Sequence, residues 1–225
     1  MIGIIAAMDS EVEAIETLLE HKELKHISGI KMIQGTIKNK RVMVLKSGVG
    51  KGNAVMATTI LLENFRIEKV INIGTAGGLK KEQSILDAVV STRVVQHDFD
   101  TSPIDGEEGI GLYFDADKEL CELCEKTLKE MDVCVHCGLV ASGDQFIAGE
   151  NQLTVLEKRF PDAVCAEMEA GAIAQVCSHY HVPFVVLRSL SDIPHKENSH
   201  MDFTTYVKHA ANRSAEFCKK FIEQL

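Results

Sequence analysis

Apolar runs of strand length alternate with amphipathic runs of helix length along almost the whole chain. Residues 2–8, 69–78 and 184–192 are short, mostly apolar stretches bounded by small or polar residues, a pattern typical of strands buried on both faces. Such alternation predicts an α/β fold with a largely parallel sheet. Further strands are expected at 30–37, 41–48, 87–98 and 134–142, and helices at 11–20, 52–65, 117–130, 151–159 and 203–222.

The segments between these runs carry recognisable start and turn signals. Ser10 and Glu13 have the spacing of a capping box for the helix at 11–20. Residues 38–40 are expected to turn a hairpin, and the Gly-rich, acidic segment 100–114 is expected to be a loop. No repeat or linker interrupts the pattern, so residues 1–225 are expected to form one domain.

Composition excludes several classes of function. A net charge of −9 and the lack of a basic patch argue against a nucleic-acid partner. No apolar run reaches the roughly 20 residues that a membrane-spanning helix needs, so no membrane partner is expected. The first residues carry no basic segment of the kind that opens a signal peptide, which favours a cytoplasmic protein.

Seven cysteines raise the question of a metal site. Cys121 and Cys124 form one C-x-x-C pair and Cys134 and Cys137 another, a spacing that resembles a zinc site. The first pair lies in a helical pattern and the second in a strand pattern, rather than on two tight knuckles. Free thiols in the protein interior are therefore the favoured interpretation.

Two glycine turns follow strands. Residues 47–54, SGVGKGNA, lack the Ser or Thr that a phosphate-binding loop needs after Lys51, and Asn53 stands where a dinucleotide fingerprint needs Gly. Residues 72–79, NIGTAGGL, form a second turn of small residues. Neither turn matches a cofactor motif, and no cofactor is expected, but both can bring backbone N–H groups to a ligand.

Three carboxylates follow the ends of predicted strands. Glu11 follows the first, Asp192 ends the last, and Glu169 lies in the apolar stretch AEMEAGAIA at 166–174, at the expected start of a helix. Each has an ordinary interpretation as a cap, a turn former or a first-turn acid. Because the carboxyl ends of parallel strands meet at one edge of a sheet, however, these acids are expected to converge with Thr75 to Gly78 on one pocket.

Histidines offer weaker candidates. His195 and His200 bracket a polar loop where a metal is a weak alternative, and His97 with Asp98 has no partner motif.

Six ordered motifs together resemble the methylthioadenosine/S-adenosylhomocysteine nucleosidases, within the wider superfamily of nucleoside phosphorylases and hydrolases. The motifs are GIIAAMDSEV, LKSGVGKGNA, INIGTAGG, SGDQFI, AEMEAGAIA and LRSLSD, and they extend over essentially the whole chain. The resemblance implies a nucleoside phosphorylase-like three-layer sandwich with a central mixed sheet, a homodimer, a small nucleoside substrate, and neither cofactor nor metal.

The resemblance also implies a role for each matching residue. Asp192 would protonate N7 of the leaving adenine, and Glu11, with Arg188 nearby, would activate the attacking water. Met168 and Glu169 would hold the ribose. The remaining contacts would be Phe146 and Ile147 to adenine, Thr75 and Gly77 to the ribose and base, and Met8, Val49 and Phe203 to the 5′-alkylthio group.

Chemistry supports these roles independently of the resemblance. Cleavage of a glycosidic C–N bond needs an acid for the leaving purine and negative groups beside a cation-like sugar. A carboxylate also suits a 2′,3′-diol, because it accepts from both hydroxyl groups. We expect the helix start to keep Glu169 ionised and Glu167 to be bound to backbone or a polar neighbour.

Two departures from the family pattern leave the substrate open. Segment 99–113 differs from the aromatic-rich loop of better-known members, which reaches the neighbouring subunit's 5′ pocket, and Thr75 replaces a common serine. The alternatives are a hydrolase of futalosine-type nucleosides, a purine nucleoside phosphorylase of the same fold, and a non-catalytic nucleoside sensor or structural dimer. Glu11 argues against the phosphorylase, because it would repel phosphate.

Overall fold

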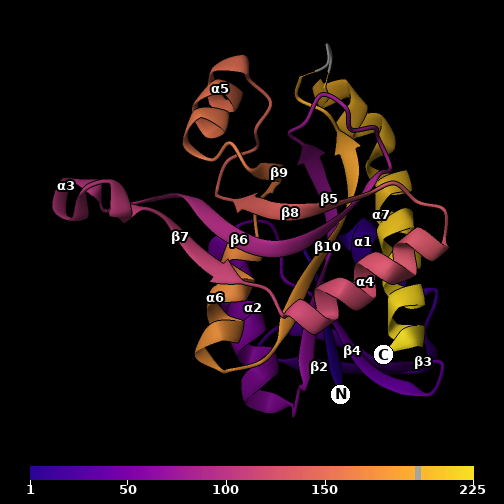
Figure 1. The fold of residues 1–225 in the computed structure, drawn as a ribbon. Coiled ribbons are helices and arrows are strands. Elements are labelled where there is room, and N and C mark those ends of the chain that lie inside the picture. The colour runs from indigo at the N-terminus through magenta and orange to yellow at the C-terminus, as the bar shows by residue number, and fades with distance from the viewer. Residues whose placement is uncertain (196–198) are drawn as a thin grey trace.

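A mixed sheet forms the centre of the molecule. The computed structural model describes residues 1–195 and 199–225, and the side chains of residues 1–195 and 203–225. Within these residues the sheet has ten strands in the order β10–β6–β8–β9–β5–β1–β4–β3–β2, and β7 pairs with β6 (Figure 1). The strands are β1 Ile2–Ala6, β2 Glu20–Ile27, β3 Ile30–Ile37, β4 Lys40–Lys46, β5 Lys69–Gly78, β6 Ala88–Asp100, β7 Ile110–Asp115, β8 Val135–Ser142, β9 Ala163–Glu167 and β10 Phe184–Asp192.

Helices cover both faces of this sheet. On one face α1, α4 and α7 pack over an apolar cluster that includes Ile4, Leu128 and Phe217. On the other face α2 and α6 pack together over a cluster that includes Leu61 and Ile173. The expected three-layer α/β sandwich is therefore confirmed. The helices are α1 Asp9–Glu16, α2 Lys51–Asn64, α3 Ser102–Asp105, α4 Lys118–Glu130, α5 Glu150–Arg159, α6 Ala170–His179 and α7 Ser199–Gln224, with a 3-10 turn η1 at Gly106–Gly109.

Strand β10 closes part of the sheet on itself. It pairs in parallel with β5 and antiparallel with β6, while β6 pairs with β8, β8 with β9 and β9 with β5. The five strands therefore form a ring. Because β1, β5 and β10 run in parallel, their carboxyl ends lie at one edge, and the register places Arg188 beside Gly74 and Asp192 beside Gly77.

The N-terminal helix differs from its expected bounds. It begins at Asp9 and ends at Glu16, and Glu20–Ile27 forms β2. The Ser10–Glu13 capping box is wrong: Glu11 instead accepts a hydrogen bond from the Met8 N–H at 3.0 Å. Strand β2 escaped prediction because its side chains are almost all polar and exposed, so no alternation marks a buried face.

The expected loop at 100–114 contains regular structure. It includes α3 and η1, and β7 returns beside β6 with Val94 opposite Phe114. This β6–β7 hairpin extends away from the body of the molecule (Figure 1). Within the described residues, no helix has the length and apolar character needed to cross a membrane.

Candidate active site

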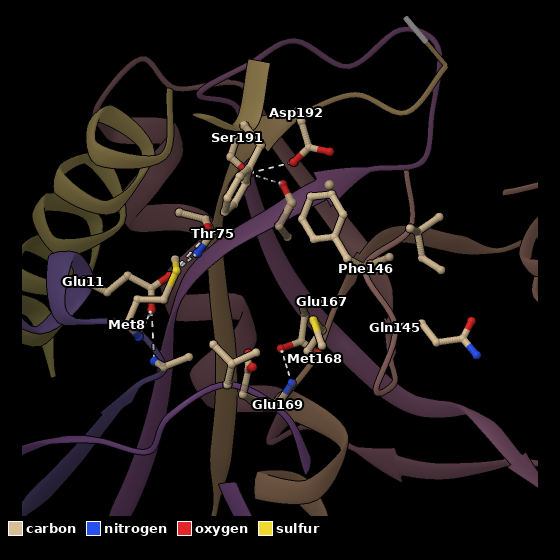
Figure 2. A pocket seen from close by; sticks show the side chains of 17 residues that line it. Met8, Glu11, Thr75, Gln145, Phe146, Glu167, Met168, Glu169, Ser191 and Asp192 are labelled. Carbon is tan, nitrogen blue, oxygen red and sulfur yellow. Dashed lines mark hydrogen bonds between the residues drawn. The ribbon is translucent and has the colours of Figure 1, made fainter. Parts of the chain in front are cut away.

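One cavity lies at the carboxyl ends of β1, β5 and β10 and contains about 650 Å³ of space not filled by atoms, including its open mouth. Figure 2 shows Asp192, Glu11 and Glu169 around it, each from a different segment of the chain. The predicted convergence of the strand-end acids is thus observed. The cavity is lined by Ala7, Met8, Glu11, Val49, Thr75, Ala76, Gly77, Gln145, Phe146, Ile147, Ala166, Glu167, Met168, Glu169, Ser191, Asp192 and Phe203.

Backbone N–H groups hold the Glu11 carboxylate. Its Oε2 accepts from the N–H groups of Ala7 and Met8, both at 3.0 Å, and its Oε1 accepts from that of Thr75 at 2.9 Å. The residue is 2% exposed. Three donors from two strand ends therefore fix both oxygens of this buried carboxylate in position.

Glu167 forms the buried ion pair of the site. Its Oε2 accepts from Arg188 Nη2, and Arg188 also donates to Asn72 Oδ1 at 2.6 Å. The Glu167 carboxylate additionally accepts from the N–H groups of Glu169 at 3.1 Å and Ala170 at 2.9 Å. Glu167 therefore caps the N-terminus of α6, where free N–H groups and the helix dipole stabilise an anion.

Glu169 stands at the N-cap position of α6, but its side chain makes no cap hydrogen bond. It turns toward the cavity and accepts from the Gly50 N–H at 2.9 Å. Burial, together with the nearby charge of Glu167, raises the pKa of Glu169 from 4.5 to about 7. The expectation that the helix start holds the Glu169 carboxylate is therefore wrong, because Glu167 accepts from those N–H groups instead.

Asp192 ends β10 at the opposite end of the cavity. It is 1% exposed, and its Oδ1 accepts from the Ser191 hydroxyl at 2.8 Å. A Cβ on Gly77 would lie 3.1 Å from Asp192 Oδ2, so a side chain there would crowd the acid. Gly74 similarly lets Arg188 and Glu11 approach the strand, since a Cβ there would lie 2.8 Å from Glu11 Oε1 and closer still to Arg188 Nη1.

Apolar side chains surround the rest of the cavity. The rings of Phe146 and Phe203 meet edge to face, with centroids 5.2 Å apart. Phe146 and Val49 are 44% and 49% exposed, so the mouth presents apolar surface to solvent. The same cavity therefore combines charged walls with an apolar mouth, as a ligand with one polar and one apolar end requires.

Eleven predicted site residues line the cavity and one does not. Arg188 is absent from the lining and is only 1% exposed, and its contacts with Glu167 and Asn72 place it behind the wall. Sequence reasoning missed Asn72, which accepts a hydrogen bond from Arg188. A polar residue in the middle of an apolar strand could have indicated a buried polar partner. The predicted residues in the lining are Met8, Glu11, Val49, Thr75, Gly77, Phe146, Ile147, Met168, Glu169, Asp192 and Phe203.

The cysteine pairs do not converge on one metal. Cys121 and Cys124 are buried on α4, as the helical pattern predicted, while Cys134 and Cys137 are exposed. The expectation that the second pair is buried is therefore wrong, because the start of β8 lies near the surface.

The weak alternative of a metal between His195 and His200 gains no support from His195. Its Nε2 lies 2.7 Å from Glu157 Oε1 and 3.0 Å from the Leu79 carbonyl oxygen, so the ring joins α5 to the end of β5. The side chain of His200 lies outside the described residues.

Lys51 and Asp98 join the two loops that border the cavity. Lys51 Nζ lies 2.5 Å from Asp98 Oδ1, and Asp98 Oδ2 accepts from the Asp144 N–H at 2.9 Å. Asp144 Oδ1 in turn accepts from the Lys51 N–H at 2.7 Å. This network of three residues holds the loop whose Gly50 N–H binds Glu169 against the loop that carries Phe146.

Comparison with known proteins fixes the family. Residues 1–223 match the family model described as the phosphorylase superfamily. The chain belongs to this superfamily. It is 41% identical over 229 residues to a 5′-methylthioadenosine/S-adenosylhomocysteine nucleosidase of Bacillus cytotoxicus, covering 100% of this chain and 99% of that protein. The resemblance drawn from the motifs is therefore confirmed.

Solved structures of this superfamily agree with the fold. The corresponding nucleosidase of Neisseria meningitidis, in complex with methylthio-immucillin-A, has a TM-score of 0.94 at 30% identity, with coverage of 100% of this chain and 99% of that one. A futalosine hydrolase of Helicobacter pylori has a TM-score of 0.92 at 32% identity, with coverage of 100% and 97%.

The two neighbouring glutamates should respond differently to removal of charge. Glu169→Gln should lower kcat/KM, with a loss of about 2–4 kcal/mol of transition-state stabilisation, because an amide donor replaces an acceptor oxygen in the cavity. Glu167→Gln should instead cost about 3 kcal/mol of folding stability, because it breaks a buried ion pair. Steady-state kinetics and thermal unfolding of both variants measure this. Equal kinetic losses, or a larger loss at Glu167, would contradict the assignment.

The loop network should affect binding more than chemistry. Lys51→Met should raise KM about fivefold, the equivalent of about 1 kcal/mol for a partly buried pair, and leave kcat nearly unchanged. Lys129→Met is the matched control, because it breaks a lysine–glutamate pair with Glu125 on the exposed face of α4. Equal KM values for wild type and Lys51→Met would show that the network does not position the loops.

Proposed function

We propose that the protein hydrolyses the N-glycosidic bond of 5′-methylthioadenosine and S-adenosylhomocysteine, releasing adenine and the 5′-thio-ribose. The observation that carries this proposal is the acidic lining of the cavity: Glu11, Glu167, Glu169 and Asp192 are in it, and among the described residues no lysine or arginine is. The similarity to the Bacillus and Neisseria nucleosidases supports the substrate.

Negative charge suits the transition state of this reaction. As the C–N bond breaks, positive charge develops on the sugar, and preorganised anions stabilise it most when they are buried and fixed. The three backbone donors to Glu11 supply such fixation. In the proposed reaction Glu11 takes a proton from the attacking water, and the water oxygen bonds to the anomeric carbon.

Proton donation to adenine is assigned to Asp192. The residue lies opposite Glu11 and Glu169 in the cavity (Figure 2). This position suits an acid that protonates the leaving base, because the other two carboxylates would then face the sugar. Protonation at N7 lets adenine leave as a neutral molecule. Arg188 is assigned the role of compensating Glu167 from behind the wall, rather than contacting the water.

Binding roles follow the position of each side chain. Glu169 and Met168 would hold the ribose, Thr75 and Gly77 the ribose and base, and Phe146 with the Ile147 backbone the adenine. The 5′-alkylthio group would lie against Met8, Val49 and Phe203, which provide apolar surface at the mouth.

Hydrolysis is favoured over phosphorolysis by the same charges. A phosphate beside the sugar would face carboxylates, whereas phosphate sites present arginines or helix N-termini. The N–H groups at the start of α6 donate to the Glu167 carboxylate, so they are not available to a phosphate. The futalosine-type substrate is the second candidate, supported by the similarity to the Helicobacter hydrolase, but the identity of 32% is lower than the 41% to the Bacillus nucleosidase.

We further propose a cytoplasmic homodimer in which residues 1–225 act as one domain. Seven cysteines without a disulfide suit a reducing compartment. The β6–β7 hairpin extends from the body (Figure 1) and exposes Phe99, Tyr113 and above all Ile104, which is 87% exposed. Such apolar side chains on a projecting hairpin are suited to reaching the cavity mouth of a second copy of the chain, while the rest of the surface holds the dimer together.

Free adenine should appear from methylthioadenosine in phosphate-free buffer. Hydrolysis needs only water, so chromatography should detect adenine and 5-methylthioribose at the same rate with or without phosphate. Detection of a ribose 1-phosphate product on adding phosphate would overturn the hydrolase proposal in favour of a phosphorylase.

Asp192→Asn should preserve the fold and abolish adenine release. The amide fills the same space but cannot supply the proton, so the rate should fall by at least about 100-fold. Isothermal titration with adenine should show that the variant still binds the base. A variant that keeps more than about a tenth of the wild-type rate would remove Asp192 from the acid role.

Deletion of residues 104–110 should raise KM severalfold for 5′-substituted substrates and leave the dimer intact, because the hairpin tip is proposed to close the partner's 5′ pocket. Sedimentation velocity checks the dimer, and kinetics with adenosine provide a substrate that lacks the alkylthio group. An unchanged KM for methylthioadenosine would place the hairpin elsewhere.

A further inference from the structure

Three metal-ligating side chains meet at the amino-terminal ends of β6 and β8. Asp87 immediately precedes β6, Cys134 immediately precedes β8, and His136 is the second residue of β8. The loop that carries Phe146 follows the other end of β8, about 20 Å away from His136 at the usual rise of a strand. The cluster is therefore separate from the cavity described above.

The strand register brings the three residues together. β6 and β8 pair in parallel with Ala88 opposite Val135, and the Ala88 N–H donates to the Cys134 carbonyl oxygen at 2.9 Å. Cys134 and His136 are two residues apart on an extended segment, so both side chains lie on the same side. Asp87, one residue before Ala88, lies beside them.

The ligand atoms have nearly the spacing of a tetrahedral site. His136 Nε2 lies 3.6 Å from Cys134 Sγ and 2.8 Å from Asp87 Oδ2, and all three atoms lie within 4.8 Å of one another. Zn–S and Zn–N bonds of about 2.3 and 2.0 Å at a tetrahedral angle place the two ligand atoms roughly 3.5 Å apart. The sulfur–nitrogen spacing already fits, and the Asp87–His136 contact needs to open by only about 0.5 Å.

Two of the three candidate ligands, Asp87 and His136, are largely buried by the surrounding structure, whereas Cys134 faces solvent. The side chains of Asp87 and His136 are 14% and 19% exposed, while Cys134 is exposed. The Ser84 N–H donates to Asp87 Oδ2 at 2.9 Å, and the Leu190 N–H donates to the Asp87 carbonyl oxygen, also at 2.9 Å. A metal here would have three protein ligands and a fourth position facing water.

We propose that Asp87, Cys134 and His136 bind one Zn²⁺ ion per chain. One thiolate, one imidazole and one carboxylate suit zinc, whereas Mg²⁺ and Ca²⁺ prefer oxygen ligands alone. On binding, the Cys134 thiol releases its proton to solvent and sulfur bonds to the metal. The ion would join the start of β6 to the start of β8. Asp87 also accepts a hydrogen bond from the N–H of Leu190, which lies two residues before Asp192 on β10.

Metal binding by the chelator-treated, tag-free full-length protein tests this proposal. Zn²⁺ added in small excess and then dialysed should remain at one ion per chain by elemental analysis. Co²⁺ should give a thiolate-to-metal absorption band that Zn²⁺ abolishes. Cys134→Ser and His136→Ala should each weaken Zn²⁺ binding by more than about tenfold, the loss typical of even indirect changes around a metal.

Cys137→Ser provides the matched control, because Cys137 is also exposed, lies three residues further along β8 and has no place in the cluster. It should bind Zn²⁺ like the wild type. Thermal unfolding without metal checks that each variant is folded. Absence of stoichiometric Zn²⁺ in the wild type, undiminished binding by Cys134→Ser, or an equal loss in Cys137→Ser would each overturn the proposal.

Discussion

The buried ion pair between Arg188 and Glu167 is the interaction on which the cavity depends. A guanidinium at 1% exposure is costly unless its charge is compensated, and here Glu167 and Asn72 bind it while Glu11 and Glu169 lie near enough to favour its charged form. The positive charge of Arg188 thus partly compensates the carboxylates that lie close together at the strand ends. It does so from behind the wall, so the surface that a ligand meets stays acidic.

Two buried carboxylates of this cavity are held in contrasting ways. Glu11 accepts from three backbone N–H groups, whereas among the described residues Glu169 accepts from one, that of Gly50, and faces the charge of Glu167. Burial therefore dominates for Glu169 and raises its pKa to about 7. The N–H groups at the N-terminus of α6 bind Glu167 and are therefore not available to the Glu169 carboxylate, which turns toward the cavity.

Sequence patterns predicted the parts of the fold where burial is continuous. The apolar strands that became β1, β5 and β10 were found because burial on both faces leaves a long apolar run, and their parallel order placed Glu11 and Asp192 at one edge. Glu169 reaches that edge by another route, because it follows β9, which pairs antiparallel with the end of β5. Strand β2 was missed because its side chains are mostly polar and exposed, so they show no alternation. Strand β7 was missed because it is short, has no buried residue and follows a Gly-rich acidic segment that is typical of a loop. The position of Arg188 depends on the register with Gly74, which no local pattern encodes.

Titration of the Glu169 carboxyl tests this account of the site most directly. Carbon-13 NMR of glutamate-labelled, ligand-free protein, with the Glu169→Gln variant to assign the resonance, should show a midpoint near pH 7. In the Glu167→Gln variant that midpoint should fall, because a like charge has been removed while Arg188 remains. A midpoint near 4.5 in the wild type, or an unchanged or higher midpoint in Glu167→Gln, would contradict the account.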